Sequence, residues 1–303
     1  MDSVCKISGR SSMPSPEFDT YIAPARLYAE PWRLLTGLGV ILLIYLGGFS
    51  IMLVGAYPVL GPLGYFGWMQ GLTTLETPGH VLFLLASFLG MGLGVLIATP
   101  ALHYREPGSL FGALRDTLRG FFRTLLVLVP IYGLLTGAAI ALLPPETNLA
   151  PAQWLRLLPV AVALLFIQTT SEELLFRGYL QQQLAARFAA RIVWMGLPAL
   201  FFTALHFNPD AGSNLPLILV STFLFALSAA NLTERTGNLG AAMGWHFVNN
   251  FNALMIISLK GSITGLSLFV TPFDISDTAI APYVFVFDLI VLVVVWRILR
   301  AVL

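Results

Sequence analysis

The chain has 303 residues, of which 57% are apolar and 10% are charged. A water-soluble domain carries about a quarter charged residues, so this composition excludes a soluble globule and indicates a membrane protein. The net charge of +1 provides no concentrated basic surface and argues against nucleic acid as a partner. The single cysteine, Cys5, excludes an internal disulfide and a zinc site built from cysteines.

Residues 1–32 differ from the rest of the chain because they are polar and contain four prolines. They lack the short apolar core and small-residue cleavage site of a signal peptide. The sequence therefore predicts a flexible cytoplasmic tail over residues 1–32, followed by one membrane-embedded helical domain over residues 33–303.

Long apolar stretches follow this tail. A helix that crosses a bilayer needs about 20 mostly apolar residues. Eight stretches meet or approach that length, namely about 34–56, 80–101, 121–143, 154–176, 192–207, 215–231, 238–258 and 283–301. The sequence thus predicts an all-α polytopic bundle of about eight transmembrane helices.

Lysine and arginine are concentrated in alternate connections between these stretches, and cytoplasmic loops are the ones enriched in these residues. The tail and the connections after the second and fourth stretches carry them, whereas the connections after the first, third and fifth carry none. This alternation predicts that both termini lie in the cytoplasm. A multi-pass protein of the plasma (inner) membrane of a bacterium or archaeon is expected.

Charged residues break the apolar pattern at residues 171–178, at a cost of about 2.5–3.5 kcal/mol for each charge near the membrane centre. Glu173 and Arg177 are four residues apart, so they share a helix face and can form an ion pair. Glu172 lies about 100° around the helix from Glu173 and is expected to point elsewhere, which leaves its carboxylate available. The alternative is a charge cluster at the membrane edge that reaches the lipid headgroups.

Polar residues also occur in two later stretches. His206 lies in an apolar segment, and His246 and Asn250 share a helix face four residues apart. Each of these groups alone is also typical of hydrogen-bonded packing between helices. If the chain turns near residue 189, Glu172 and His206 each lie 17 residues from the turn and reach one depth. His246 joins them only if the connection before it lies deeper than that turn.

Three motifs on successive apolar segments resemble the CAAX-protease and bacteriocin-processing (abortive-infection) family of intramembrane proteases. The EExxxR motif begins at Glu172, the FxxxH motif runs from Phe202 to His206, and the HxxxN motif runs from His246 to Asn250. The resemblance covers about residues 150–255, which it marks as the catalytic core. The N-terminal half matches only as generic membrane helices.

The resemblance implies a helical membrane enzyme that hydrolyses a peptide bond without a cofactor. It implies that Glu172 is the general base that activates water and that His206 assists it. It also implies that His246 and Asn250 stabilise the oxyanion. Glu173, Arg177 and Phe202 are then supporting residues. The expected partners are a membrane-associated, possibly lipidated, peptide or protein and the bilayer itself, and the oligomeric state is left open.

Other functions remain possible from the sequence. Glu172, His206 and His246 could supply three zinc ligands and leave a position for water, as in a zinc-dependent membrane protease. The cluster could also be a structural polar knot in an immunity or scaffold protein. A transporter that relays protons is weakened because no inverted repeat is evident.

Overall fold

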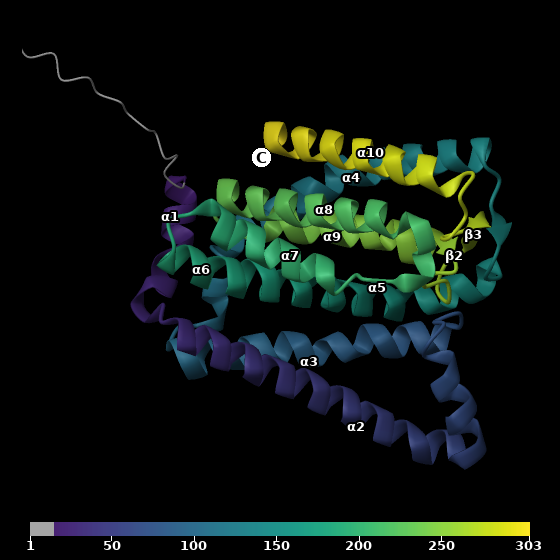
Figure 1. Ribbon diagram of the computed structural model, residues 1–303, viewed down its shortest axis with the longest axis horizontal. Helices are drawn as coiled ribbons and strands as arrows, with labels where there is room; N and C mark the ends of the chain where they lie inside the picture. The colour runs from purple at the N-terminus through teal and green to yellow at the C-terminus, as the bar shows by residue number, and fades with distance from the viewer. Residues whose placement is uncertain (1–14) are drawn as a thin grey trace, which may run out of the picture.

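A computed structural model describes residues 15–303, and these form a bundle of long helices with a small sheet at one end (Figure 1). The helices are α1 (Pro16–Ile22), α2 (Pro31–Gly71), α3 (Pro78–His103), α4 (Leu114–Leu142), α5 (Pro151–Glu173), α6 (Gln182–Arg187), α7 (Leu197–Ala204), α8 (Leu215–Thr236), α9 (Gly240–Phe251) and α10 (Ala281–Val302). The prediction of a predominantly helical membrane fold is confirmed.

Shorter helical segments connect several of these elements. Three are 3-10 helices, namely η1 (Ala23–Tyr28), η2 (Pro107–Leu110) and η5 (Pro209–Asn214). Three are π-helical, namely η3 (Leu174–Gln181), η4 (Ile192–Gly196) and η6 (Asn252–Ile256). Because η3 and α6 continue directly from α5, the helix runs without a break from Pro151 to Arg187. Glu172 is therefore separated from the turn near residue 189 by helix, as its predicted depth assumed.

Five helices of the described chain are long and apolar enough to cross a membrane, and Ile192–Ala204 is a shorter apolar helix. The chain is therefore a multi-pass membrane protein. Four of the five begin with proline, and the fifth begins at Leu114. Proline is tolerated in the first helical turn because the backbone N–H that it lacks would have no partner there. Each of the eight predicted stretches contains helix, but the count of eight spans stays a prediction.

A three-stranded sheet corrects the all-α expectation. Strands β1 (Glu146–Thr147), β2 (Ile257–Lys260) and β3 (Phe269–Asp274) are arranged in the order β1-β3-β2. β1 is antiparallel to β3, with Glu146 opposite Val270, and β2 is parallel to β3. β1 pairs with β3 across more than 100 residues, and all three strands are too short to show a periodic pattern of their own, which is why the sequence did not reveal them.

The N-terminal segment also differs from the expectation. Residues 1–14 lie outside the described part of the chain, but residues 16–28 form α1 and η1 instead of a flexible tail. Phe18 is fully buried and stacks on Trp194, with ring centroids 5.0 Å apart. The Tyr21 hydroxyl donates a hydrogen bond of 2.5 Å to the Leu110 carbonyl oxygen. The rings of Phe18, Tyr21 and Trp194 thus hold this segment against the bundle. Its polar composition did not indicate that one of its faces is buried.

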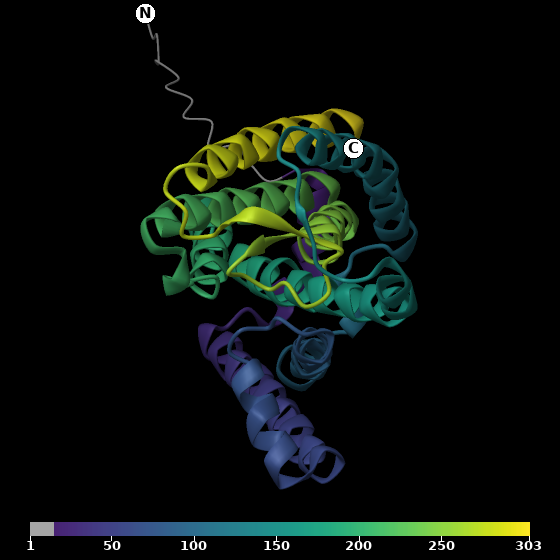
Figure 2. The same cartoon turned by 90° about the vertical axis from the view of Figure 1, so that its right-hand side faces the viewer.

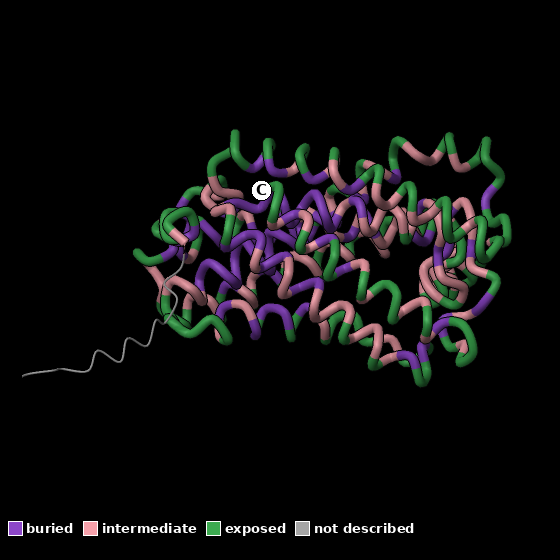
Figure 3. The backbone as a smooth tube through the Cα atoms, turned by 90° about the horizontal axis from the view of Figure 1, so that it is seen from above, coloured by how far each residue is buried: buried purple, intermediate pink, exposed green. Residues whose placement is uncertain are grey.

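The buried core follows the central helices of the bundle. Figure 3 shows buried positions concentrated along the middle of the molecule, with exposed positions on the outer helices. α1 and the C-terminus lie toward one end of the bundle and the sheet lies at the other (Figure 1). That the end with α1 and the C-terminus faces the cytoplasm stays a prediction, because this arrangement does not test it.

Candidate active site

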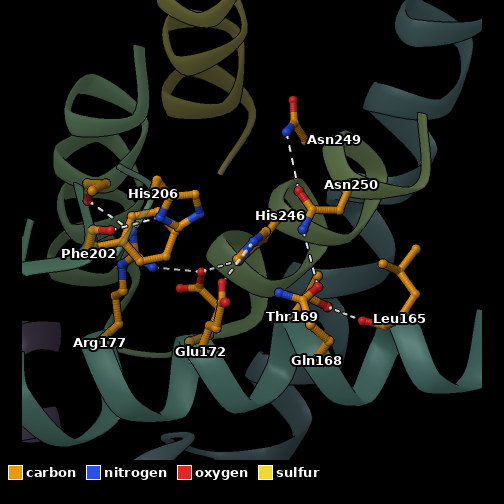
Figure 4. A network of polar contacts seen from close by, with 12 residues as sticks. Leu165, Gln168, Thr169, Glu172, Arg177, Phe202, His206, His246, Asn249 and Asn250 are labelled. Atoms are coloured by element: carbon orange, nitrogen blue, oxygen red, sulfur yellow. Dashed lines mark hydrogen bonds and ion pairs between the residues drawn. The ribbon is translucent and has the colours of Figure 1, made fainter. Parts of the chain in front are cut away.

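One face of the continuous α5–η3 helix carries most of the buried charge. Glu172, Glu173 and Arg177 are 8%, 0% and 2% exposed, and Gln168 lies one turn earlier and is 6% exposed. Figure 4 shows Gln168, Glu172 and Arg177 rising from this helix toward the two imidazoles. The change to π-helical geometry at Leu174 falls directly after the two glutamates, and such segments are frequent at functional sites because they redirect side chains.

Glu173 and Arg177 form the ion pair that their spacing predicted. The Arg177 guanidinium donates to Glu173 Oε1 at 2.8 Å and also to the carbonyl oxygen of Ala226 at 3.2 Å. Its central carbon lies 5.0 Å from the centre of the Phe202 ring, within the range of a cation–π contact. Arg177 therefore ties α5–η3 to both α7 and α8.

His246 lies between the two adjacent carboxylates. Its Nδ1 donates to Glu173 Oε1 at 2.7 Å, and its Nε2 lies 3.4 Å from Glu172 Oε2. The carboxylate oxygen of Glu173 can only accept, so Nδ1 carries the proton. This corrects the expectation that Glu172 points away from Glu173, because an imidazole has a nitrogen on each edge and both carboxylates reach the same ring.

Two glycines allow α9 to place His246 at this depth. A Cβ atom on Gly240 would lie 2.1 Å from the carbonyl oxygen of Thr117, and one on Gly244 would lie 2.9 Å from the Cβ of Thr124. Small residues at four-residue spacing let membrane helices pack closely, here α9 against α4. The connection before α9 is itself buried, with Leu239 fully inaccessible. His246 does meet the α5 residues, because its two ring nitrogens reach Glu172 and Glu173.

Asn250 lies one turn after His246 and contacts Gln168, which was not predicted as a site residue. Its side-chain amide donates to Gln168 Oε1 at 3.2 Å, and its own oxygen accepts from Asn249 Nδ2 at 3.4 Å. The Tyr132 hydroxyl of α4 donates to Asn249 Oδ1 at 3.1 Å. Gln168 could have been found from its position, because it is a polar residue four before Glu172 in an apolar stretch.

His206 is present near this cluster but does not join it by a hydrogen bond. Its Nδ1 donates to the Phe202 carbonyl oxygen at 2.8 Å, which leaves Nε2 as the free acceptor nitrogen. Within residues 15–303 no hydrogen bond or ion pair links His206 to Glu172. The Phe202 ring lies between the two histidines, with centroids 4.4 Å from His206 and 6.0 Å from His246.

A cavity of about 240 Å³ borders these residues. It is lined by side chains from α4, α7, α8, α9 and α10, among them Tyr132, Phe202, His206, Ser221, Phe225, Trp245, His246, Asn249, Asn250, Phe285, Asp288 and Leu292. Glu172 is not among the lining residues, and its buried Oε2 has no hydrogen-bond partner in the described chain. The cavity therefore reaches both histidines and Asn250 directly, with Glu172 behind His246.

The zinc alternative requires three ligand side chains close together. Within residues 15–303 no group of three or more His, Cys, Asp or Glu side chains is placed to hold a metal ion.

Comparison with known proteins finds a family match in the part of the chain that contains this site. Residues 153–252 match the family model described as type II CAAX prenyl endopeptidase Rce1-like. The predicted family resemblance is confirmed. This Rce1-like segment contains every site residue named from the sequence, namely Glu172, Glu173, Arg177, Phe202, His206, His246 and Asn250.

One curated relative of the chain is an uncharacterized protein, YyaK of Bacillus subtilis (strain 168). The two are 31% identical over 121 residues, and the match covers 40% of this chain and 40% of the relative's length. No solved structure matched the chain. The individual roles of the residues in the Rce1-like segment remain predictions.

Proposed function

We propose that this chain is an intramembrane endopeptidase that hydrolyses a peptide bond in a membrane-associated substrate, using water activated by Glu172. The observation that carries the proposal is the position of His246, held between Glu172 and Glu173 at the edge of a cavity, with Asn250 one turn away. Buried charge inside apolar helices is costly and is retained where it acts.

The contacts support a division of work between the two glutamates. Glu173 is already engaged by Arg177 and by His246 Nδ1, so it fixes the orientation of the imidazole. Glu172 has no arginine or lysine partner within the described residues, and its Oε2 accepts no hydrogen bond. A carboxylate without competing donors is suited to take a proton from a water molecule.

The proposed reaction follows from these positions. Glu172 removes a proton from water, and the hydroxide adds to the carbonyl carbon of the scissile bond. The side-chain amide of Asn250 donates to the resulting oxyanion, with His246 beside it, and such donors are typically worth about 2.7–4 kcal/mol. Protonated Glu172 then gives its proton to the leaving amine, and the tetrahedral intermediate separates into a carboxylic acid and an amine.

His206 would act at the cavity side of the reacting centre. Because its Nδ1 is bound to the Phe202 carbonyl oxygen, its Nε2 can accept a hydrogen bond from the second O–H of the attacking water and hold that water in place. This requires the water to bridge the space between His206 and Glu172, which no direct contact closes. Phe202 supports the arrangement by packing against both imidazoles.

We further propose a lipidated peptide as the substrate class and the plasma membrane as the location. The name of the matching family refers to prenylated C-terminal motifs. The site lies among apolar helices, so a lipid-anchored peptide reaches it from the bilayer with its anchor still in lipid. A farnesylated peptide should therefore be cleaved faster than the same peptide without the lipid.

The test uses the full chain reconstituted in liposomes with a farnesyl-cysteine peptide and its unlipidated twin. Mass spectrometry of the products should show one internal cleavage, lost in the Glu172→Gln variant and retained in Glu106→Gln, which changes an exposed glutamate outside the site. A zinc chelator should have no effect, whereas loss of cleavage with chelator and its recovery with zinc would favour the zinc protease. Equal cleavage by Glu172→Gln would contradict the proposal, and the absence of any cleavage would favour the scaffold alternative.

A further inference from the structure

Asp288 is a charged residue in the apolar part of α10 that none of the three motifs includes. It follows the run Val284–Phe287 and precedes Leu289–Val295, and α10 has no other acidic residue. An unpaired carboxylate at such a position costs about 2.5–3.5 kcal/mol near the membrane centre. An acid that is retained at that cost requires an explanation in terms of what it contacts.

Asp288 faces the same cavity as the proposed catalytic residues. Phe285, Asp288 and Leu292 form one stripe of α10, at spacings of three and four residues, and all three line the cavity. The lining also includes His206 and His246. The carboxylate therefore borders the space in which the proposed function places the substrate.

Ser221 of α8 orients this carboxylate. Its hydroxyl donates to Asp288 Oδ2 at 2.9 Å, and Ser221 itself lines the cavity. Asp288 Oδ1 accepts no hydrogen bond from the described residues, and Asp288 forms no ion pair with any Lys, Arg or His among residues 15–303. One oxygen is thus held in place while the negative charge has no partner within the protein.

The surroundings increase the preference of this carboxylate for a cation. Phe225, Trp245, Phe285 and Leu292 supply apolar walls to the cavity. Asp288 itself is exposed in the cavity, and a substrate that fills the cavity shields it from water, so that the attraction between opposite charges becomes stronger. A hydrogen bond from a charged donor is also worth more than one from a neutral amide.

We propose that Asp288, oriented by Ser221, is a specificity-determining residue that binds a lysine or arginine side chain of the substrate peptide near the scissile bond. This inference rests on the proposed function and specifies its substrate class as a membrane-associated peptide with a basic residue. Asp288 binds and positions the substrate, and it takes no part in the proton transfers assigned to Glu172.

The test compares farnesyl-cysteine peptides in which each position upstream of the cysteine is lysine, norleucine or glutamate in turn. For at least one position, wild type should cleave the lysine peptide with a kcat/KM about tenfold or more above that of its norleucine twin. The lysine-to-norleucine ratio should fall to near one in Asp288→Asn, persist in Asp288→Glu, and remain unchanged in Asp210→Asn, which alters an exposed acid outside the cavity.

A structural role for the Ser221–Asp288 contact would lower the cleavage of both peptides equally and leave the ratio unchanged, which would overturn the inference. Binding is measured separately by fluorescence anisotropy of the same peptides on the Glu172→Gln variant with and without Asp288→Asn. If wild type cleaves neither peptide, the proposed function fails. If the lysine peptide binds more tightly than the norleucine peptide, and this difference is lost in Asp288→Asn, the result would still support a cation-binding site at Asp288. Equal binding of the two peptides would refute it.

Discussion

The α2–α3 hairpin and the α5–α9 region are both built from apolar helices, yet they are held together in different ways. α2 has 41 residues, and its buried positions are limited to Gly37 and Ile41. In Figures 1 and 2 most of α2 extends away from the central helices, and α3 lies between them. In contrast, α9 has 12 residues, of which eight are buried. In a bilayer the apolar surface of α2 can contact lipid, so burial against protein is not required there.

The difference lies in the polar side chains. α5, η3 and α9 carry glutamate, glutamine, arginine, histidine and asparagine that contact one another at defined distances. Hydrogen bonds and ion pairs have directions, whereas apolar side chains gain similar energy from lipid and from protein. We infer that the α5–α9 region is ordered by its site, whereas α2 is ordered mainly by its length and hydrophobicity. The following substitutions test that comparison.

In the α5–α9 region the largest loss of stability should come from Arg177→Met. It removes the cation that neutralises Glu173 and leaves a buried carboxylate without its partner, which typically costs about 3–5 kcal/mol. Denaturant unfolding in detergent micelles measures the change. Arg187→Met removes an exposed arginine from the end of the same helix and should change stability by about 0.5 kcal/mol or less. Similar losses in both variants would mean that the buried pair has no special role.

Asn250→Ala should have the next largest effect, and it should act on the reaction rate. Loss of the proposed oxyanion donor is expected to lower kcat about 10²–10³-fold while the protein remains folded. Asn252→Ala is the matched control, because Asn252 lies on the same helical run but accepts a hydrogen bond from Thr136 instead. If both variants lose activity together, the effect comes from disruption of the helix and not from the oxyanion.

Gln168→Ala should have a smaller effect. Gln168 accepts the hydrogen bond that orients the Asn250 amide, and a typical net contribution of such a bond is about 0.5–1.5 kcal/mol. We expect kcat/KM to fall by about two- to tenfold, with no further loss when the change is combined with Asn250→Ala. A fully additive double variant would contradict the link between these two residues.

The smallest effect is expected in the α2–α3 hairpin. Leu63 is 92% exposed, so Leu63→Ala removes contacts with lipid and not with protein. Stability and activity should change little, by about 0.5 kcal/mol or less in the free energy of unfolding. Phe18→Ala provides the contrast, because this ring is fully buried and its removal should cost about 3–5 kcal/mol. A large effect at Leu63 would show that the hairpin packs against a further surface.

The sequence allowed the prediction of those features that depend on spacing along one helix. The pairing of Glu173 with Arg177 followed from four-residue periodicity, and the helices followed from apolar length. Contacts between helices could be only partly predicted. The sharing of His246 by two carboxylates depends on how closely α9 approaches α5, and this in turn depends on the packing of Gly240 and Gly244 against α4.

Two regions were not predictable for a different reason. β1 gains its hydrogen bonds only from β3, which is far away in the sequence, and β2 and β3 are too short to show a strand pattern. The N-terminal helix has a polar composition, and only the positions of Phe18 and Tyr21 in the folded bundle show that it is packed. Asp288 was visible in the sequence as a charge in an apolar helix, but its position at the cavity required the fold.

The most direct test compares Glu172→Gln with Glu173→Gln, in both stability and cleavage of the farnesyl-cysteine peptide. Glu172→Gln should abolish cleavage and leave the unfolding transition close to that of wild type, because Glu172 Oε2 accepts no hydrogen bond. Glu173→Gln should lower stability as well as cleavage, because it leaves Arg177 without its buried counter-charge. Cleavage that survives Glu172→Gln, or a Glu173→Gln protein as stable as wild type, would contradict the separate roles assigned to these neighbouring residues.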